Sequence, residues 1–150
     1  MPIKSRTPAK TAGAAARPAG YSGTPLPKKL GIRPGHRVLL VGAPLEFALT
    51  LGQLPEGAAL TRRLKTPPDL TIWFVTSRRE LVNGIAKHAA RLVTGSIWIA
   101  WPKKSSGQST DLSENDVQRA GLGAGLVDYK VCAITEVWSG LLFTRRNNAQ

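Results

Sequence analysis

Hydrophobic residues gather into short runs along the chain, and glycine, proline and charged residues separate these runs. The runs at 37–41, 70–75 and 95–101 are almost wholly apolar, as expected for strands that are covered on both faces of a sheet. Two further runs, 126–135 and 138–145, are separated by a tight turn. They predict a hairpin at the C-terminal end of the sheet.

The clearest helix signal lies between the second and third of these runs. Ser77 and Glu80 have the spacing of a capping box, in which a hydroxyl and a carboxylate satisfy free backbone N–H groups. Apolar residues then recur at helical spacing and predict one buried face. The residues expected on that face are Leu81, Val82, Ile85, Ala86, Ala89, Leu92 and Val93.

Weaker signals fill the remaining intervals. Ser113 is expected to cap a helix over 113–120, since acidic residues follow it in the first turn, where the helix dipole favours them. A short helix is expected over 45–54 and a short strand over 59–64. The glycine-rich string 121–125 follows a helix, so it is interpreted as the helix C-cap and a connecting turn rather than a phosphate loop.

Strands that alternate with helices and end in a hairpin predict the α/β class. We expect a Rossmann-like three-layer sandwich with a mostly parallel sheet of about six strands, closed by a C-terminal antiparallel hairpin. This Rossmann-like domain is assigned to residues 37–146. A disordered basic tail is expected at 1–20, an extended N-terminal arm at 21–36 and a disordered end at 147–150.

The charge of the chain is strongly positive. It has 21 Lys and Arg against 9 Asp and Glu, a formal net charge of +12. Four basic residues and no acid lie in the first 20 positions, which leaves +8 on the rest. Such a charge favours anionic partners, so nucleic acid is one partner class, reached through the basic tail.

Other partner classes find less support. No apolar run is long enough to cross a bilayer and no secretory signal is evident, so we expect no membrane partner and a cytoplasmic location. The only cysteine, Cys132, lies in an apolar strand and has only His36 and His88 as further soft ligands. We therefore expect a buried structural thiol and no metal site.

A ligand site is predicted at the carboxyl ends of the parallel strands, where sheets of this class bind ligands. Loops after the strands, together with the turn of the hairpin, bring polar residues to that rim. The candidate ligand-binding residues are Gly42, Pro44, Thr76, Arg78, Lys103, Lys104, Ser105, Asp111, Glu136 and Trp138.

The chemistry of these candidates allows more than one interpretation. Lys103 and Lys104 have the character of an anion clamp, or of a solvated loop. Arg78 begins a helix, where free N–H groups attract anions. Glu136 and Asp111 are candidates for an acid–base pair, and Trp138 either stacks on a flat ligand or caps the core. No nucleophile–base pair is evident, so the catalytic residues are unassigned.

Three segments resemble parts of the class I S-adenosylmethionine-dependent methyltransferase fold: 33–42 its first strand, 68–75 its fourth and 92–100 its fifth. One strand and its helix are missing between Leu64 and Asp69. The resemblance implies a cofactor loop after the first strand.

That cofactor loop is degenerate in this chain. A dinucleotide fingerprint needs about three glycines, whereas this chain has Gly42 followed by Pro44. Leu64 and Lys65 stand where an acidic residue for a ribose is expected.

A second resemblance is to an uncharacterised bacterial family, the domain of unknown function numbered three thousand and fifty-two. It spans about residues 21–146 and implies no known activity. The similar segments are 21–26, 28–31, 41–44, 101–105 and 136–140.

Three functions are therefore considered. The first is a non-catalytic binding or regulatory module that takes an anionic ligand or a protein partner at the rim, with no cofactor expected. The second is a basic protein that associates with nucleic acid. The third is a methyltransferase that holds S-adenosylmethionine in an atypical site between Gly42, Pro44 and the Lys103 loop.

Overall fold

The structure is a computed structural model that describes residues 24–146. The segments 1–20 and 147–150, for which disorder is predicted, lie outside the described residues. In the part of the chain that the structure describes, no helix has the length and apolar character needed to cross a membrane.

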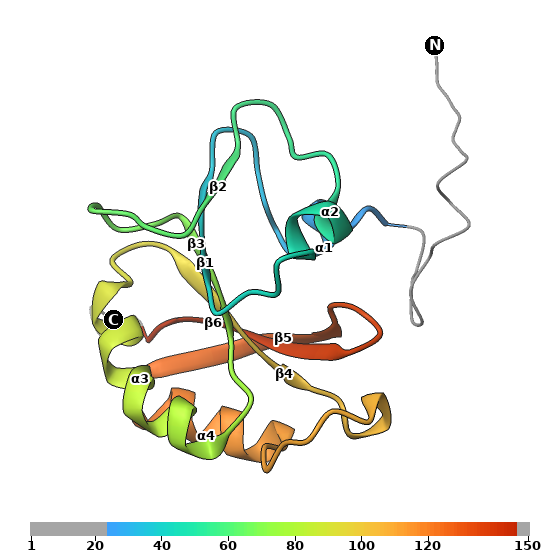
Figure 1. Cartoon of the computed structure of the whole chain (residues 1–150). Coiled ribbons are helices and arrows are strands. Elements are labelled where there is room, and N and C mark those ends of the chain that lie inside the picture. Colours follow the sequence, from blue (N-terminus) through green and yellow to red (C-terminus); the bar gives the residue numbers. More distant parts are fainter. Residues whose placement is uncertain (1–23, 147–150) are drawn as a thin grey trace.

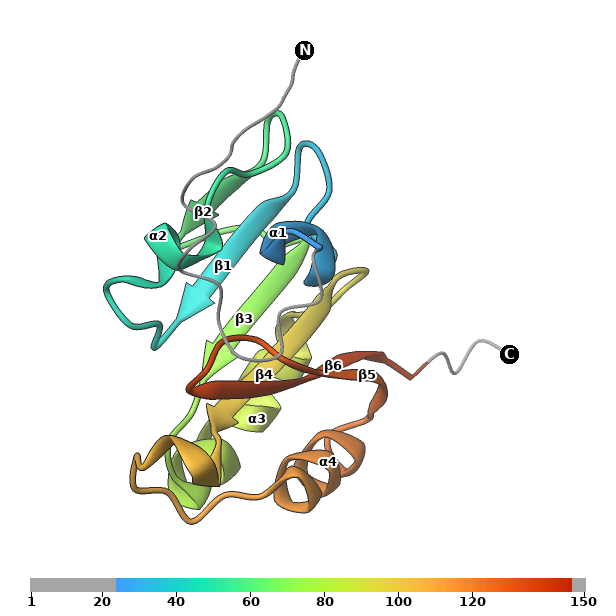
Figure 2. The ribbon, with the colours of Figure 1, turned by 90° about the vertical axis from the view of Figure 1, so that its right-hand side faces the viewer.

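A six-stranded sheet forms the centre of the molecule, in the order β2-β1-β3-β4-β6-β5 (Figures 1 and 2). Strands β2, β1, β3 and β4 are parallel, and β6 is antiparallel to both β4 and β5. This arrangement confirms the predicted fold class, including the closing hairpin. The strands are β1 (Arg37–Val41), β2 (Ala59–Thr61), β3 (Leu70–Phe74), β4 (Ser96–Pro102), β5 (Leu126–Ala133) and β6 (Trp138–Arg145).

Helices cover both faces of the sheet. One face carries α1 (Leu26–Lys29) and α2 (Phe47–Leu51), and the other carries α3 (Arg78–Arg91) and α4 (Glu114–Gly123) (Figure 1). Each face has its own buried cluster. The first joins Phe47 and Leu51 to Trp98, and the second joins Leu81 and Val117 to Ile99. The three layers therefore enclose two cores, because alternate residues of the central strands point to opposite faces.

The described part of the segment predicted as an extended arm, 24–36, is folded onto the sheet, where packing of Leu30 and Ile32 was expected to begin. It contains the short helix α1, and Leu30 and Ile32 directly after it are 1% and 4% exposed. The indole of Trp98 donates a hydrogen bond of 2.9 Å to the carbonyl oxygen of Leu30. Burial of these two side chains stabilises the folded conformation of a segment whose prolines favour an extended arm with turns.

Helix α3 begins as predicted but buries a narrower face. Ser77 Oγ accepts a hydrogen bond from the Glu80 N–H, whereas the Glu80 carboxylate accepts from the Thr76 N–H rather than from the cap residue. The expectation that Val82, Ala86 and Val93 are buried is wrong, because all three are exposed. The buried positions of α3 are Leu81, His88 and Ala89.

The other boundaries differ from the predictions by a few residues. Helix α2 and strand β2 are shorter than expected, whereas α4 continues to Gly123. The predicted cap of α4 is confirmed, since Ser113 and Asp116 form a complete capping box. Only Gly125 of the glycine-rich string has a positive φ, of 88°, and it forms the turn into β5.

Strand β5 lies at one edge of the sheet and is irregular. Its pairing with β6 shifts between Asp128 and Lys130, so Tyr129 forms a bulge. Val127, Tyr129 and Val131 are exposed along this strand.

Candidate functional site

A pocket of about 1000 Å³ opens between α1, the segment 44–55 and the turn of the β5–β6 hairpin. Figure 2 shows α1 and α2 on the same face of the sheet, and the turn of the β5–β6 hairpin near the carboxyl end of β3. The apolar part of the wall comes from Leu26, Phe47, Leu54, Ile134, Val137 and Trp138. The pocket therefore lies on the α1–α2 face of the sheet, and the hairpin turn and Pro44 bring it to the carboxyl ends of the parallel strands.

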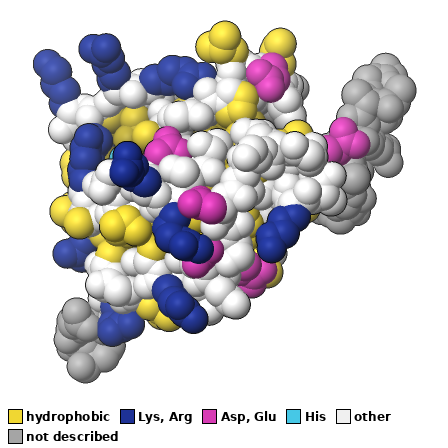
Figure 3. Space-filling view, turned by 60° about the horizontal axis from the view of Figure 1, so that its bottom comes forward, with side chains coloured by type: hydrophobic (Ala, Val, Ile, Leu, Met, Phe, Trp, Pro, Cys, Tyr) yellow, Lys and Arg dark blue, Asp and Glu magenta, His cyan; other side chains and the backbone are white. Residues whose placement is uncertain are grey.

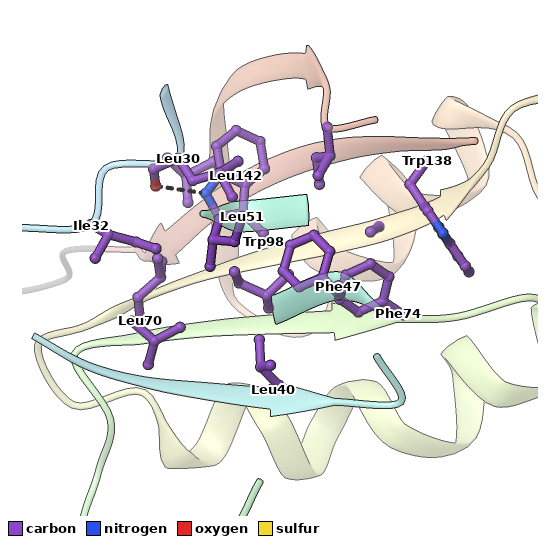
Figure 4. Close-up of a cluster of buried hydrophobic side chains, with 14 residues drawn as sticks. Leu30, Ile32, Leu40, Phe47, Leu51, Leu70, Phe74, Trp98, Trp138 and Leu142 are labelled. Atoms are coloured by element: carbon purple, nitrogen blue, oxygen red, sulfur yellow. Dashed lines mark hydrogen bonds between the residues drawn. The ribbon is translucent and has the colours of Figure 1, made fainter. Parts of the chain in front are cut away.

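Three aromatic rings pack together in the buried cluster beside this pocket, and two of them, Phe47 and Trp138, line its wall (Figure 4). Phe74, the last residue of β3, contacts Phe47 and Trp138 edge-on, with ring centroids 4.9 Å apart in each pair. Trp138 is only 8% exposed. Its main role is thus to cap the core, and the remaining exposed part of its side chain faces the pocket.

The turn after β1 packs tightly against β3. Gly42 has a φ of 68°, and a Cβ at this position would lie 2.8 Å from the carbonyl oxygen of Phe74. The chain passes from β1 outward to β2 and returns to β3 on the other side of β1, so the strand order reverses between β1 and β3. Sheets of this class bind ligands at the carboxyl ends of the two strands at such a reversal. In this chain, the Gly42 turn and the rings of Phe47 and Phe74 occupy that point.

The pocket carries side chains of both charges. Lys28 and Lys29 come from α1, Glu46 precedes α2 and Glu136 lies in the hairpin turn. The ammonium of Lys29 donates to the carbonyl of Ala133 at 2.9 Å, so it joins α1 to β5. Among residues 24–146, no ion pair involves Lys28, Glu46 or Glu136.

Three of the predicted site residues line the pocket: Pro44, Glu136 and Trp138. Gly42 is adjacent to it in the chain and supports the turn. The other candidates lie elsewhere, in two separate groups.

The first of these groups fastens the start of α3 to the loop before α4. The Arg78 N–H donates to the Asp111 carboxylate at 2.7 Å, and the Thr110 hydroxyl donates to the carbonyl of Thr76 at 2.8 Å. The carboxylate of Asp111 therefore occupies the helix N-terminus at which an external anion was predicted. Asp111 and Glu136 belong to different sites, so the predicted acid–base pair is not assembled.

The Arg78 guanidinium lies 3.4 Å from the carboxylate of Asp116. The pKa of Asp116 is lowered, first by the hydrogen bond from the Ser113 hydroxyl and further by Arg78. Arg78 thus has a partner within the fold.

The second group is the loop after β4. Lys103 donates its backbone N–H to the carbonyl of Val137 at 2.7 Å, which places it beside the hairpin turn. Lys104 and Ser105 lie on the 3-10 helix η2 (Lys104–Ser106) and are exposed. This loop supports the turn from outside the pocket, and its two lysines do not line the wall.

Sequence reasoning missed the contribution of α1 and α2 to the site. Leu26, Lys28, Thr50 and Gln53 line the pocket, although none was a candidate. Four of the five segments quoted for the resemblance to the domain of unknown function contribute to this wall, and the fifth contains Lys103.

Neither histidine nor cysteine contributes to the pocket. His88 is 8% exposed, and its ring centroid lies 4.4 Å from that of Trp73. Burial, with smaller contributions from Lys87 and Arg91, lowers the pKa of His88 to about 4. Burial raises the pKa of the Cys132 thiol, which packs beside the first core cluster. Within residues 24–146, no group of three His, Cys, Asp or Glu side chains is placed to hold a metal ion.

The fold has counterparts among solved structures. A SAM-dependent methyltransferase from Aquifex aeolicus superposes with a TM-score of 0.54 at 16% identity, over 77% of this chain and 85% of its own. A ribosomal protein L11 methylase from Lactobacillus delbrueckii subsp. bulgaricus gives a TM-score of 0.50 at 12% identity, over 81% of this chain and 76% of its own. A protein of the NADB-Rossmann superfamily from Streptococcus agalactiae gives a TM-score of 0.50 at 11% identity, over 85% of this chain and 71% of its own.

The chain has a Rossmann-like fold that is similar to that of SAM-dependent methyltransferases. At these identities the likeness concerns the fold alone. No family model and no curated protein sequence matches the chain, so membership of the domain-of-unknown-function family stays a prediction.

Proposed function

We propose that this chain is a ligand-binding module built on a methyltransferase fold, and that its ligand enters the pocket between α1, α2 and the hairpin turn. One observation carries this proposal. The Gly42 turn and the rings of Phe47 and Phe74 occupy the point of strand reversal, whereas a pocket of about 1000 Å³ lies open beside it. That volume lies within the range of small-molecule sites, which hold from roughly 300 to 1000 Å³.

The wall suits a small organic ligand with an apolar body and an anionic group. The apolar body would lie against Leu26, Phe47 and Val137. The anionic group would pair with Lys28, while Glu46 and Glu136 would accept hydrogen bonds from ligand hydroxyl or ammonium groups. The proposed role is binding rather than catalysis, because the wall residues within 24–146 include no nucleophile with an adjacent base.

An anionic aromatic probe tests the pocket. 8-Anilinonaphthalene-1-sulfonate should become fluorescent with the full chain. Lys28→Gln should weaken its binding several-fold, and Thr50→Trp should abolish it by filling the space. Lys104→Gln removes the same charge outside the pocket and should change little. Equal effects of the two lysine variants, or no probe binding to the folded protein, would overturn the proposal.

The second candidate is an atypical S-adenosylmethionine site. The fold and the mixed charges of the pocket favour it, because this cofactor carries an ammonium, a sulfonium and a carboxylate. Calorimetry of the full chain with S-adenosylmethionine distinguishes the two candidates. The first predicts no heat of binding at millimolar cofactor, whereas micromolar affinity that weakens in Glu136→Gln would establish the second.

A further inference from the structure

Six basic residues lie on the three segments that meet at the C-terminal end of α3, on the face of the sheet opposite α1 and α2. They come from the β2–β3 loop, from α3 itself and from the end of β6. We call them the basic cluster: Arg63, Lys65, Lys87, Arg91, Arg145 and Arg146.

Hydrogen bonds bring the three segments together. The guanidinium of Arg91 donates to the carbonyl of Leu64 at 2.8 Å. That of Arg145 donates to the carbonyls of Ala89 and Leu92 at 2.8 and 3.1 Å. The loop and the end of β6 therefore both touch the last turn of α3. Figure 3 shows Lys and Arg gathered along its left side, the side on which this loop and this end of α3 lie in Figure 1.

The charge of the cluster is not compensated within the fold. The ion pairs between described residues are Arg37–Asp69 and Arg78–Asp116, and neither includes a member of the cluster. Two members, Lys87 and Arg91, also contribute to the lowered pKa of His88. The α3 C-terminus carries a partial negative charge of about one half, too little to offset six cations.

The cluster keeps donors free for an external acceptor. A guanidinium has five N–H groups, and Arg91 and Arg145 donate only some of theirs to backbone carbonyls. Arg63, Lys65 and Lys87 are exposed, and their side chains make no hydrogen bond with a described residue. Because two of the arginines are already held in place, less side-chain entropy is lost when they bind phosphate.

We propose that the basic cluster binds the phosphate backbone of double-stranded nucleic acid without reading its sequence. This function goes beyond the ligand pocket and does not depend on it. Single strands are bound by stacking their bases on exposed aromatic rings. All four tryptophans and all three phenylalanines are buried, and the only exposed aromatic side chain among residues 24–146 is Tyr129, on β5.

An anionic membrane is the competing partner for such a cluster. Interfacial helices hold to a membrane by inserting an apolar face below the headgroups. The apolar face of α3, with Leu81 and Ala89, is instead buried against the sheet. The exposed apolar side chains on this side of α3 are single residues eleven positions apart, Val82 and Val93. The cluster thus offers much charge and little apolar surface for insertion, which favours nucleic acid.

The test is a binding titration of the full chain with a 20-base-pair duplex across a salt series. The triple variant Arg63→Gln, Lys65→Gln, Lys87→Gln removes three charges from the cluster. Its matched control, Arg33→Gln, Lys104→Gln, Arg119→Gln, removes three exposed charges elsewhere. Both retain the basic residues of the first 20 positions, so the contribution of that segment cancels in the comparison.

We expect the cluster variant to weaken binding at least five-fold. It should also lower the slope of log affinity against log salt by about 2.7, at roughly 0.9 for each lost phosphate contact. The control should stay within two-fold of the unmodified chain. DNA and RNA duplexes should bind alike, and a single strand of equal length more weakly.

Three results would overturn the proposal: no duplex binding at low salt, equal losses in both variants, or a preference for single strands. Binding to phosphatidylserine vesicles in place of duplexes would assign the cluster to a membrane surface instead.

Discussion

The indole nitrogen of Trp98 and the carbonyl oxygen of Leu30 form a hydrogen bond of 2.9 Å inside the core, although the two residues lie 68 positions apart (Figure 4). Trp98 and Leu30 are 0% and 1% exposed. This bond satisfies a carbonyl that water does not reach, and it fastens the segment after α1 to the middle of β4. The position of α1 over the pocket therefore depends on it.

Replacing Trp98 with Phe should destabilise the protein by about 2–3 kcal/mol, because the buried carbonyl of Leu30 loses its partner and a cavity forms. Urea denaturation measures this loss. Trp73→Phe is the control, since Trp73 is also buried and its indole makes no hydrogen bond with a described residue. If both variants lower the free energy of unfolding equally, the loss comes from the smaller side chain alone and the hydrogen bond contributes nothing.

Two neighbouring glycines of α4 should respond in opposite ways to alanine. A Cβ on Gly121 would overlap the ring of Phe143, which is fully buried and has no room to move, so Gly121→Ala should cost about 1–3 kcal/mol. Nothing lies within 4 Å of a Cβ on Gly123. Gly123→Ala should therefore be neutral or stabilise by about 0.5 kcal/mol through helix propensity. Thermal unfolding of both variants checks the contrast.

Stability should fall in mild acid because of His88. The pKa of His88 is about 4 in the folded protein, against 6.5 as its ordinary value. As the pH falls from 6.5 to 4, the unfolded chain binds a proton that the folded protein does not bind. The stability present above pH 6.5 is therefore lost over this window, by up to about 3 kcal/mol.

Urea midpoints measured between pH 4 and 8 test this dependence. His88→Gln should flatten the curve in that window, because the group that titrates is gone. Asn83→Gln, an exposed and non-titrating substitution on the same helix, should keep the slope. The carboxylates common to all three proteins cancel in the comparison. A slope that persists in His88→Gln would contradict the assignment.

Asp111 should behave as a helix-capping residue rather than as part of a ligand site. Asp111→Ala removes the acceptor of the Arg78 N–H and should cost about 1 kcal/mol, as for other helix N-terminal acceptors. Asp111→Asn retains an oxygen acceptor and should cost less. Probe binding in the pocket should be unchanged in both variants, and Glu114→Ala controls for the loss of an acidic side chain nearby. A loss of probe affinity in either variant would show that Asp111 contributes to ligand binding after all.

The apolar strands could be predicted from the sequence almost residue by residue. The predicted bounds of β1 and β6 match the structure, because a run such as Val38–Val41 is flanked by residues that do not continue it. Helix α1 could not be predicted in this way. It is four residues long, and Leu30 and Ile32 hold it in place through contacts made only in the folded protein.

Three of the ten predicted site residues lie in the wall of the pocket, whereas the ligand site itself stays a prediction. The rule that ligands bind at the carboxyl edge of a parallel sheet led to Pro44, Glu136 and Trp138, which line the pocket. The same rule does not say which face of that edge is open. Arg78 and Asp111 reach the edge on the α3 face, where they bind each other. The conformation of the loops decides which candidates line the pocket and which bind each other, and that conformation depends on tertiary contacts.

The bulge at Tyr129 has a consequence for encounters between copies of the chain. Strand β5 exposes one row of backbone donors and acceptors, together with Val127, Tyr129 and Val131, and such an edge is a template for strand addition. The bulge divides this row into two short stretches, 126–128 and 130–133, that are out of step with each other. An incoming strand in register with one stretch is out of register with the other, so edge-to-edge growth stops after a few hydrogen bonds.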